Sequence, residues 1–142
     1  MTLVVVPVRF PLSDHSRATL KEAIRISRER GAELSVLHVD LYQDSHHVSR
    51  TELKRAVEAE FGELDHARYV VRRGFLVEET ILEEIAAERA DVVVIGSKQV
   101  SQWQRMVRKL LSDPDIGSYL REKLDCTVIT VDADGHTDKT DE

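Results

Sequence analysis

The sequence has few residues that cross-link the chain or break its regular structure, and no segment long enough to cross a bilayer. Its 142 residues include one cysteine, three prolines and six glycines. One cysteine, Cys126, cannot form an intramolecular disulfide or supply the paired ligands of a zinc site. The longest apolar runs, such as 3–6, are too short for a signal peptide or a membrane span. These absences predict a cytoplasmic protein without a membrane segment.

Length and charge narrow the class of protein further. A chain of 142 residues with 42% hydrophobic content is long enough for one domain with a substantial core. The net charge of −6 favours solubility and argues against a general nucleic-acid or membrane surface. We therefore expect one domain, over residues 1–132. The polar tail, residues 133–142, has no periodicity and is predicted to be disordered.

Five short runs are typical of buried strands, because they are almost continuously apolar and rich in β-branched residues. They cover residues 3–8, 33–39, 67–72, 91–96 and 126–131. Helical periodicity lies between them, at 14–30, 50–62, 77–89 and about 113–124. Helix-end signals support these helices: Gly31 as a C-cap, Ser49 with Glu52 as a capping box, and Pro114 in a first turn.

This alternation predicts an α/β fold: a doubly wound, five-stranded parallel sheet with helices on both faces. In such a sheet ligands bind at the carboxyl ends of the strands, where the strand order reverses. Two loops are the candidates: residues 9–13 after the first strand, and the segment that starts at Gly96 after the fourth.

The stretch VVVPVRFPLSDHSRATLKEAIRIS resembles the opening of universal stress proteins, in which a strand is followed by a serine-bearing loop and a long helix. GAELSVLHV is similar to that family's second strand, and RRGFLVEETILEEIAAERADVVVIGS to its third helix and fourth strand. LDCTVITV resembles its closing strand. The resemblance spans about residues 3–131 and implies the strand order 3-2-1-4-5. It also implies a homodimer formed through strand 126–131, whose apolar edge would otherwise be bare.

Some universal stress proteins bind ATP, with an aspartate after the first strand and a G-x-x-G-x9-G-S/T loop around the phosphates. The glycines of such a loop let backbone N–H groups approach the phosphates. On this resemblance, ATP or a related nucleotide is the candidate ligand. The residues at the matching positions, with nearby cations, are Pro7, Val8, Arg9, Val39, Gly96, Ser97, Lys98, Arg105 and Arg108.

The chain departs from that pattern in three places. Arg9 stands where the aspartate is expected, and it has donors but no acceptor for an adenine amino group. Gln99 replaces the second glycine. Gly117-Ser118 could supply the final Gly-Ser. The family's spacing before the closing-strand cysteine, counted back from Cys126, instead favours Pro114-Asp115 at that position, with Gly117 as a packing glycine inside a helix. Proline lacks an N–H, and a carboxylate repels phosphate, so these changes weaken the ATP site.

Residues 98–109 are basic and contain no acid, and three interpretations remain open. They form a solvated face of an amphipathic helix with Trp103, Met106 and Val107 packed inward. Alternatively, they hold a small anion, or they contact a partner or nucleic acid.

Other polar residues predict no catalytic or metal chemistry. His46 and His47 are adjacent and lack a third metal ligand, so we interpret them as a polar loop. His38 is expected to have a structural hydrogen bond. The chain lacks a phosphate-binding G-x-x-x-x-G-K-[ST] loop, a G-x-G-x-x-G turn and any nucleophile–base set. The sequence thus favours a non-enzymatic, dimeric stress protein with a diverged ATP loop, which acts through partner or ligand binding. The alternatives are a nucleotide- or anion-binding protein and, less favoured, a nucleic-acid-associated module.

Overall fold

The computed structural model describes residues 2–115, 117, 126–132 and 137–141. The described helices are α1 (Asp14–Arg30), α2 (Arg50–Phe61), α3 (Val77–Glu88) and α4 (Ser97–Leu111). The described strands are β1 (Leu3–Pro7), β2 (Glu33–Leu41), β3 (Ala67–Gly74), β4 (Val92–Gly96), β5 (Thr127–Val131) and β6 (Thr137–Asp141). Of these helices, none has the length and apolarity needed to cross a bilayer.

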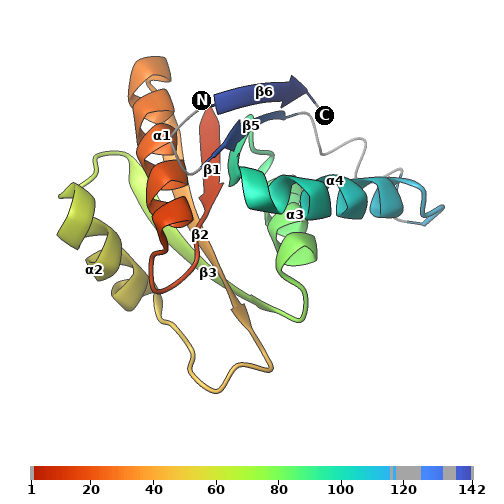
Figure 1. Ribbon diagram of the computed structural model, residues 1–142, viewed down its shortest axis with the longest axis horizontal. Helices are drawn as coiled ribbons and strands as arrows, with labels where there is room; N and C mark the ends of the chain where they lie inside the picture. Colours follow the sequence, from red (N-terminus) through yellow and green to blue (C-terminus); the bar gives the residue numbers. More distant parts are fainter. Residues whose placement is uncertain (1, 116, 118–125, 133–136, 142) are drawn as a thin grey trace.

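The strands form one sheet in the order β3-β2-β1-β4-β5-β6 (Figure 1). The first five strands pair in parallel, and β6 pairs antiparallel with β5. The predicted parallel sheet of order 3-2-1-4-5 is therefore confirmed. The chain moves outward from β1 to β2 and β3, and it then returns to β4 on the other side of β1. The reversal of strand order lies between β1 and β4.

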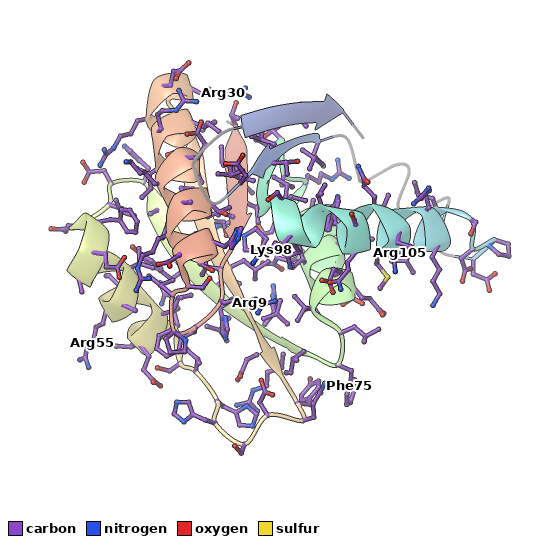
Figure 2. All side chains as sticks on the ribbon, in the orientation of Figure 1. Arg9, Arg30, Arg55, Phe75, Lys98 and Arg105 are labelled. Atoms are coloured by element: carbon purple, nitrogen blue, oxygen red, sulfur yellow. The ribbon has the colours of Figure 1, made fainter. Side chains whose placement is uncertain are left out.

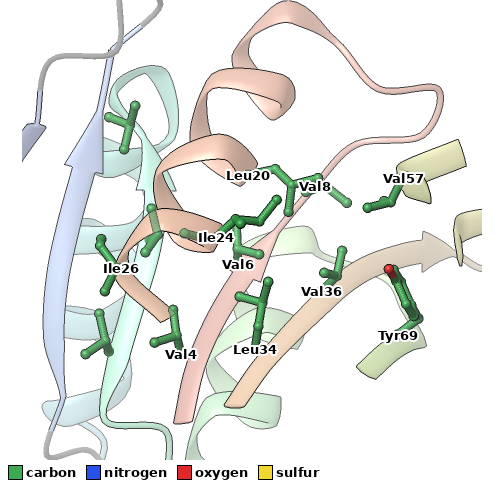
Figure 3. Close-up of a cluster of buried hydrophobic side chains, with 14 of the residues drawn as sticks. Val4, Val6, Val8, Leu20, Ile24, Ile26, Leu34, Val36, Val57 and Tyr69 are labelled. Atoms are coloured by element: carbon green, nitrogen blue, oxygen red, sulfur yellow. The ribbon is translucent and has the colours of Figure 1, made fainter. Parts of the chain in front are cut away.

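Both faces of the sheet are covered by helices. Side chains of α1 and α2 build one apolar cluster with the sheet, and side chains of α3 and α4 build the other. Alternate residues of β1 enter opposite clusters: Val4 and Val6 join the first, shown in Figure 3, and Val5 joins the second. Burial on both faces explains why the strand segments are continuously apolar rather than alternating.

The helix ends form as the sequence predicted. Ser13 is the N-cap of α1 and accepts a hydrogen bond from Ser16 N. Gly31 ends that helix with φ 58°, a left-handed conformation that glycine adopts without strain. Ser49 and Glu52 make the reciprocal bonds of a capping box at the start of α2.

Helix α4 begins directly after β4, and its basic segment packs as an amphipathic helix. Trp103 and Val107 are buried in the cluster beneath α3 and α4. Arg105, Arg108 and Lys109 are exposed on the other side. The interpretation of residues 98–109 as one solvated, basic helix face is consistent with this arrangement.

The C-terminal tail differs from the prediction of disorder. Thr137–Asp141 form β6, which pairs with β5 from Val131↔Thr137 to Thr127↔Asp141. A polar composition argues against a buried strand, but an edge strand pairs through its backbone and needs no apolar face. The prediction of a bare β5 edge is corrected by the same pairing, because this chain covers that edge itself. The homodimer stays a prediction.

The turn after α4 shows how the next helical segment begins. Asp113 Oδ1 accepts a hydrogen bond from Asp115 N at 2.8 Å, and Asp113 O accepts one from Gly117 N at 2.8 Å. These bonds place Asp113 at an N-cap, with Pro114 directly after it in the first turn. The body of the helix predicted at 113–124 lies outside the described residues.

Gly117 has a packing role, as the spacing from Cys126 predicted. It is buried, and a Cβ at this position would collide with the carbonyl oxygen of Leu111. The missing side chain lets the new helical turn pack against the end of α4. Ser118 lies outside the described residues.

A buried carboxylate on α3 provides a test of the packing between α3 and β3. Glu84 is 3% exposed, and its Oε1 accepts hydrogen bonds from the Arg72 guanidinium at 2.9 Å. We expect Arg72→Met to lower the free energy of unfolding by about 2 kcal/mol, because the carboxylate is left buried without its cation. The effect stays below that of a fully buried pair, since Arg72 is half exposed.

Urea unfolding measures this change. Arg68→Met is the matched control: Arg68 also lies on β3 and pairs with Glu88 on α3, but Glu88 is 30% exposed. We expect Arg68→Met to lower the free energy of unfolding by less than about 1 kcal/mol. Adding Glu84→Gln to Arg72→Met should restore part of the lost free energy of unfolding, because the uncompensated buried charge is removed. Equal losses in the two single variants would contradict the role assigned to Glu84.

Tyr69 provides a test at alkaline pH. Its side chain is 5% exposed and its hydroxyl has no hydrogen-bond partner. Burial, with a smaller contribution from Glu58, raises the pKa of Tyr69 to about 12. The unfolded chain ionises near its ordinary pKa of about 10. The raised pKa therefore costs no stability below pH ~10, and the free energy of unfolding falls as the pH rises from about 10 through 12.

Ultraviolet absorbance of the phenolate should show a late-titrating component from Tyr69 in the native protein. Tyr69→Phe should remove that late component. Tyr42→Phe, at an exposed site, should leave it in place. A late component that persists in Tyr69→Phe would assign it to another residue.

Candidate functional site

The carboxyl ends of β1 and β4 meet where the strand order reverses, which is where open α/β sheets bind ligands. Val4 pairs with Val92 and Val5 with Val93. Continued along both strands, this register brings Val8 opposite Gly96. The N-terminal turn of α1 lies at the same edge, because α1 follows β1 after a short loop and packs on β1 and β4. We call this carboxyl edge around Gly96 the β1–β4 cleft, after the place where open α/β sheets bind ligands.

The loop after β1 is held at both of its first residues. Val8 N donates to Leu37 O at 2.8 Å, and Val8 O lies 3.0 Å from His38 Nδ1. Arg9 N donates to Ser16 Oγ at 2.9 Å. The Arg9 side chain is exposed, and among the described residues it forms no ion pair. The backbone is thus fixed while the guanidinium is free to meet a ligand. The hydrogen bond of His38 confirms its predicted structural role.

The start of α4 offers unpaired backbone donors. Gly96 is its N-cap, no side chain caps the helix, and the first turn has no acidic residue. The first N–H groups of an α-helix have no partner within the helix, and its dipole is positive at that end. Lys98 adds an exposed ammonium in the same turn. This end of α4 therefore favours an anion.

Two side chains of α1 face Gly96 from the opposite side. A Cβ built on Gly96 would lie 3.7 Å from Thr19 Oγ1 and 4.0 Å from His15 Nδ1. Thr19 Oγ1 donates to His15 O at 2.7 Å, whereas His15 Nδ1 is buried without a hydrogen-bond partner. The cleft thus contains a polar nitrogen that the protein leaves unsatisfied.

His15 and Thr19 were not among the predicted site residues. Their spacing of four residues puts both on one face of a helix, and the first turn of α1 had to lie at the carboxyl edge. The four-residue spacing, combined with this position of the first turn, was the sequence signal that could have identified His15 and Thr19 as site residues. The orientation of the face toward Gly96 became visible only with the packed sheet.

The predicted site residues separate into two groups. Pro7, Val8 and Arg9 lie at the end of β1, and Gly96, Ser97 and Lys98 lie at the end of the neighbouring strand β4, so both groups are at the same carboxyl edge. Val39 lies just beyond the end of β1 along β2 and is 8% exposed, with its side chain in the core beneath α3 and α4. Arg105 and Arg108 lie about 10 and 15 Å farther along α4 than Lys98, given the rise of an α-helix (Figure 2). The structure does not bring those two arginines to the cleft.

The two halves of the expected phosphate loop are also far apart. Helix α4, with 15 residues, separates Gly96 from Pro114 and Asp115. A straight helix of that length is about 22 Å long. A phosphate bound at Gly96 therefore has no second clamp from Pro114-Asp115. What remains at Gly96 is an open helix end.

His47, one of the two adjacent histidines predicted to form a polar loop, is held against the end of β2. His47 Nδ1 lies 3.0 Å from Asp40 Oδ2, and Arg73 Nε lies 3.7 Å from the same oxygen. Asp40 is 2% exposed, so these two side chains compensate a buried carboxylate. No group of three or more metal-ligating side chains occurs in the part of the chain that the structure describes.

Comparison with known proteins agrees with the fold. A family model described as the universal stress protein family matches residues 1–132. No curated protein sequence is similar enough to the chain to count as a match.

Two solved structures are similar across most of the chain. One is a universal stress protein in complex with cAMP, with a TM-score of 0.57 and 16% identity over 92% of this chain and 96% of that chain. The other is the hypothetical protein MJ0577, with a TM-score of 0.55 and 16% identity over 92% of this chain and 95% of that chain. At this identity the likeness shows a shared fold. Together with the family model, which covers nearly the whole chain, it leads to one conclusion: this chain belongs to the universal stress protein family.

Proposed function

We propose that the chain is a non-enzymatic universal stress protein that binds a small phosphate-bearing ligand, of the nucleotide class, in the β1–β4 cleft. The observation that carries the proposal is the uncapped, acid-free start of α4 at Gly96. Backbone N–H groups there would donate to phosphate oxygens, as they do at other helix N-termini. Lys98 and Arg9 would add two charges, and neither pairs with an acid of the described chain.

His15 supports the same proposal. Its Nδ1 is buried without a partner near Gly96, and leaving such a group unsatisfied costs free energy. If the His15 ring turned to present this nitrogen, a ligand oxygen beside Gly96 would relieve that cost by accepting a hydrogen bond from Nδ1–H. Phosphate is a suitable acceptor, because its oxygens can receive several donors at once.

The size of the ligand follows from what the cleft lacks. Arg9 replaces the aspartate expected near an adenine, and Gln99 replaces the second glycine of the loop. Pro114 and Asp115 lie at the far end of α4 and cannot close over a triphosphate. We therefore propose a ligand with a single phosphate, such as a nucleoside monophosphate or a cyclic nucleotide. One solved structure of similar fold is a complex with cAMP, which is consistent with this class.

Three further properties belong to the proposal. The protein would act in the cytoplasm, through ligand-dependent contacts with a partner, and as a homodimer. Since β6 covers the edge of β5, a dimer formed through β5 would first require that strand to move. No catalysis is proposed, so AMP or ATP incubated with the protein should be recovered unchanged.

Calorimetric titration at low salt tests the ligand. We expect AMP and cAMP to bind, and adenosine to bind at least tenfold more weakly, because it lacks the phosphate. Lys98→Ala should weaken AMP binding about tenfold, the effect of losing one charge-assisted contact. Lys109→Ala is the matched control, since Lys109 is exposed in the last turn of the same helix.

His15→Ala and Arg9→Asp should each weaken AMP binding in the same assay. Adenosine binding as tight as that of AMP would contradict a phosphate site. Equal effects of Lys98→Ala and Lys109→Ala would show attraction by the whole helix instead. In that case a salt-sensitive interaction with RNA or DNA, the nucleic-acid alternative, becomes the better account.

A further inference from the structure

Large apolar side chains are exposed at one place in the described chain. They are Tyr42, 51% exposed, Phe75, 70% exposed, and Leu76, 52% exposed. We call these three residues the aromatic tip. They follow the ends of β2 and β3, beyond the cleft, and Phe75 lies at the far end of these strands (Figure 2). A cluster of exposed large apolar side chains is typical of an interaction site.

The tip projects because β2 and β3 are longer than β1. β1 ends at Pro7, opposite Leu37, whereas β2 continues to Leu41, opposite Gly74. The two strands therefore extend past the cleft as a two-stranded arm (Figure 1). Tyr42 continues this arm by donating its N–H to Gly74 O at 3.0 Å.

Hydrogen bonds hold the tip in one arrangement. Gln43 Nε2 donates to Phe75 O at 3.1 Å, which joins the two loops. Thr80 N and Oγ1 both donate to Leu76 O, at 3.2 and 2.7 Å. The rings of Tyr42 and Phe75 contact each other, with centroids 4.8 Å apart and planes tilted by 44°. The exposed rings are thus preorganised, which lowers the entropy lost on binding.

Gly74 contributes to this arrangement. A Cβ at Gly74 would collide with Thr80 Oγ1. The glycine therefore lets the first turn of α3, which contains Glu78 and Glu79, approach the end of β3.

The charges around the tip are predominantly negative. Asp44, Glu78 and Glu79 lie next to it in the β2–α2 loop and the first turn of α3, and no ion pair of the described residues includes them. The nearby cations are already compensated, because Arg72 pairs with Glu84 and Arg73 with Asp40.

The neighbouring carboxylate Glu83 is also affected by this environment. Burial, followed by the charge of Glu79, raises its pKa. A cation placed over the first turn of α3 would relieve that repulsion.

We propose that the aromatic tip docks a basic segment of a partner protein, with an arginine or lysine over the exposed rings and an apolar side chain against Leu76. Aromatic faces attract cations, and the surrounding carboxylates add charge complementarity. The same carboxylates would repel phosphates, so a polypeptide fits this surface better than a nucleic acid. The tip lies apart from Gly96 and Lys98, so its proposed role does not depend on the phosphate site.

The test uses the ¹⁵N-labelled full chain and a capped probe peptide of alternating leucine and arginine. We expect saturable shifts of the amides of Tyr42, Phe75 and Leu76 in NMR spectra. Phe75→Ala should weaken peptide binding about fivefold or more, whereas Phe75→Tyr keeps an aromatic face and should retain it. Because Phe75 is exposed, neither change should disturb folding, which thermal unfolding checks.

The contribution of charge is tested separately. Replacing arginine by glutamate in the peptide should abolish the shifts. Glu78→Gln combined with Glu79→Gln should weaken binding severalfold, with the largest effect at low salt. Glu63→Gln is the matched control, because Glu63 is exposed on the loop before β3. This loop lies at the amino end of β3, whereas the aromatic tip lies at its carboxyl end. Glu63→Gln should leave the affinity unchanged.

Three outcomes would overturn the proposal. One is equal binding of the glutamate peptide, which would indicate unspecific apolar contact. Another is a single-stranded oligonucleotide that shifts the tip amides in place of the peptide. The third is concentration-dependent association through the tip without peptide, which would identify a second copy as the occupant. AMP binding should be unchanged in Phe75→Ala, so failure of one proposal leaves the other testable.

Discussion

Coverage of the sheet on both faces is the constraint on which the rest of this structure depends. The buried apolar side chains of the five parallel strands belong to one of two apolar clusters. Polar groups can therefore meet a ligand only at strand ends, in the loops and first helical turns of the carboxyl edge. Charges that remain inside must be compensated, as Glu84 is by Arg72 and Asp40 by His47 and Arg73. The positions of the candidate sites follow from this packing.

Helix α4 shows how core packing and ligand binding are linked. Trp103 and Val107 fill the cluster beneath α3 and α4, and this burial favours a continuous helix over a loop. A helix that starts at Gly96 offers its N-terminal donors to the cleft. The same helix carries its later residues away from that cleft. The burial of Trp103 in the core thus accompanies the helix start at the proposed phosphate site, which keeps only the first half of the family's loop.

Much of this fold could be predicted from the sequence, because the signals were local. Continuous apolar runs indicated strands buried on both faces, and capping residues such as Ser49 indicated helix starts. Counting from Cys126 identified Gly117 as a packing residue. The site was less predictable, since it depends on tertiary placement. His15 reaches Gly96 only through the packing of α1 on β4, and Arg105 and Arg108 leave the cleft because α4 is straight. Tyr42 and Phe75 meet only when β2 and β3 pair.

The antiparallel strand β6 has a consequence for how the chain is made. It follows β5 in the sequence, so all five parallel strands leave the ribosome before it does. Domains fold from the N-terminus during synthesis, and an unpaired strand edge is a point at which chains associate wrongly. Until β6 has emerged and paired, β5 is such an edge. Its protection therefore depends on when β6 emerges, and a chain that stopped after residue 132 would have β5 as an unpaired edge strand.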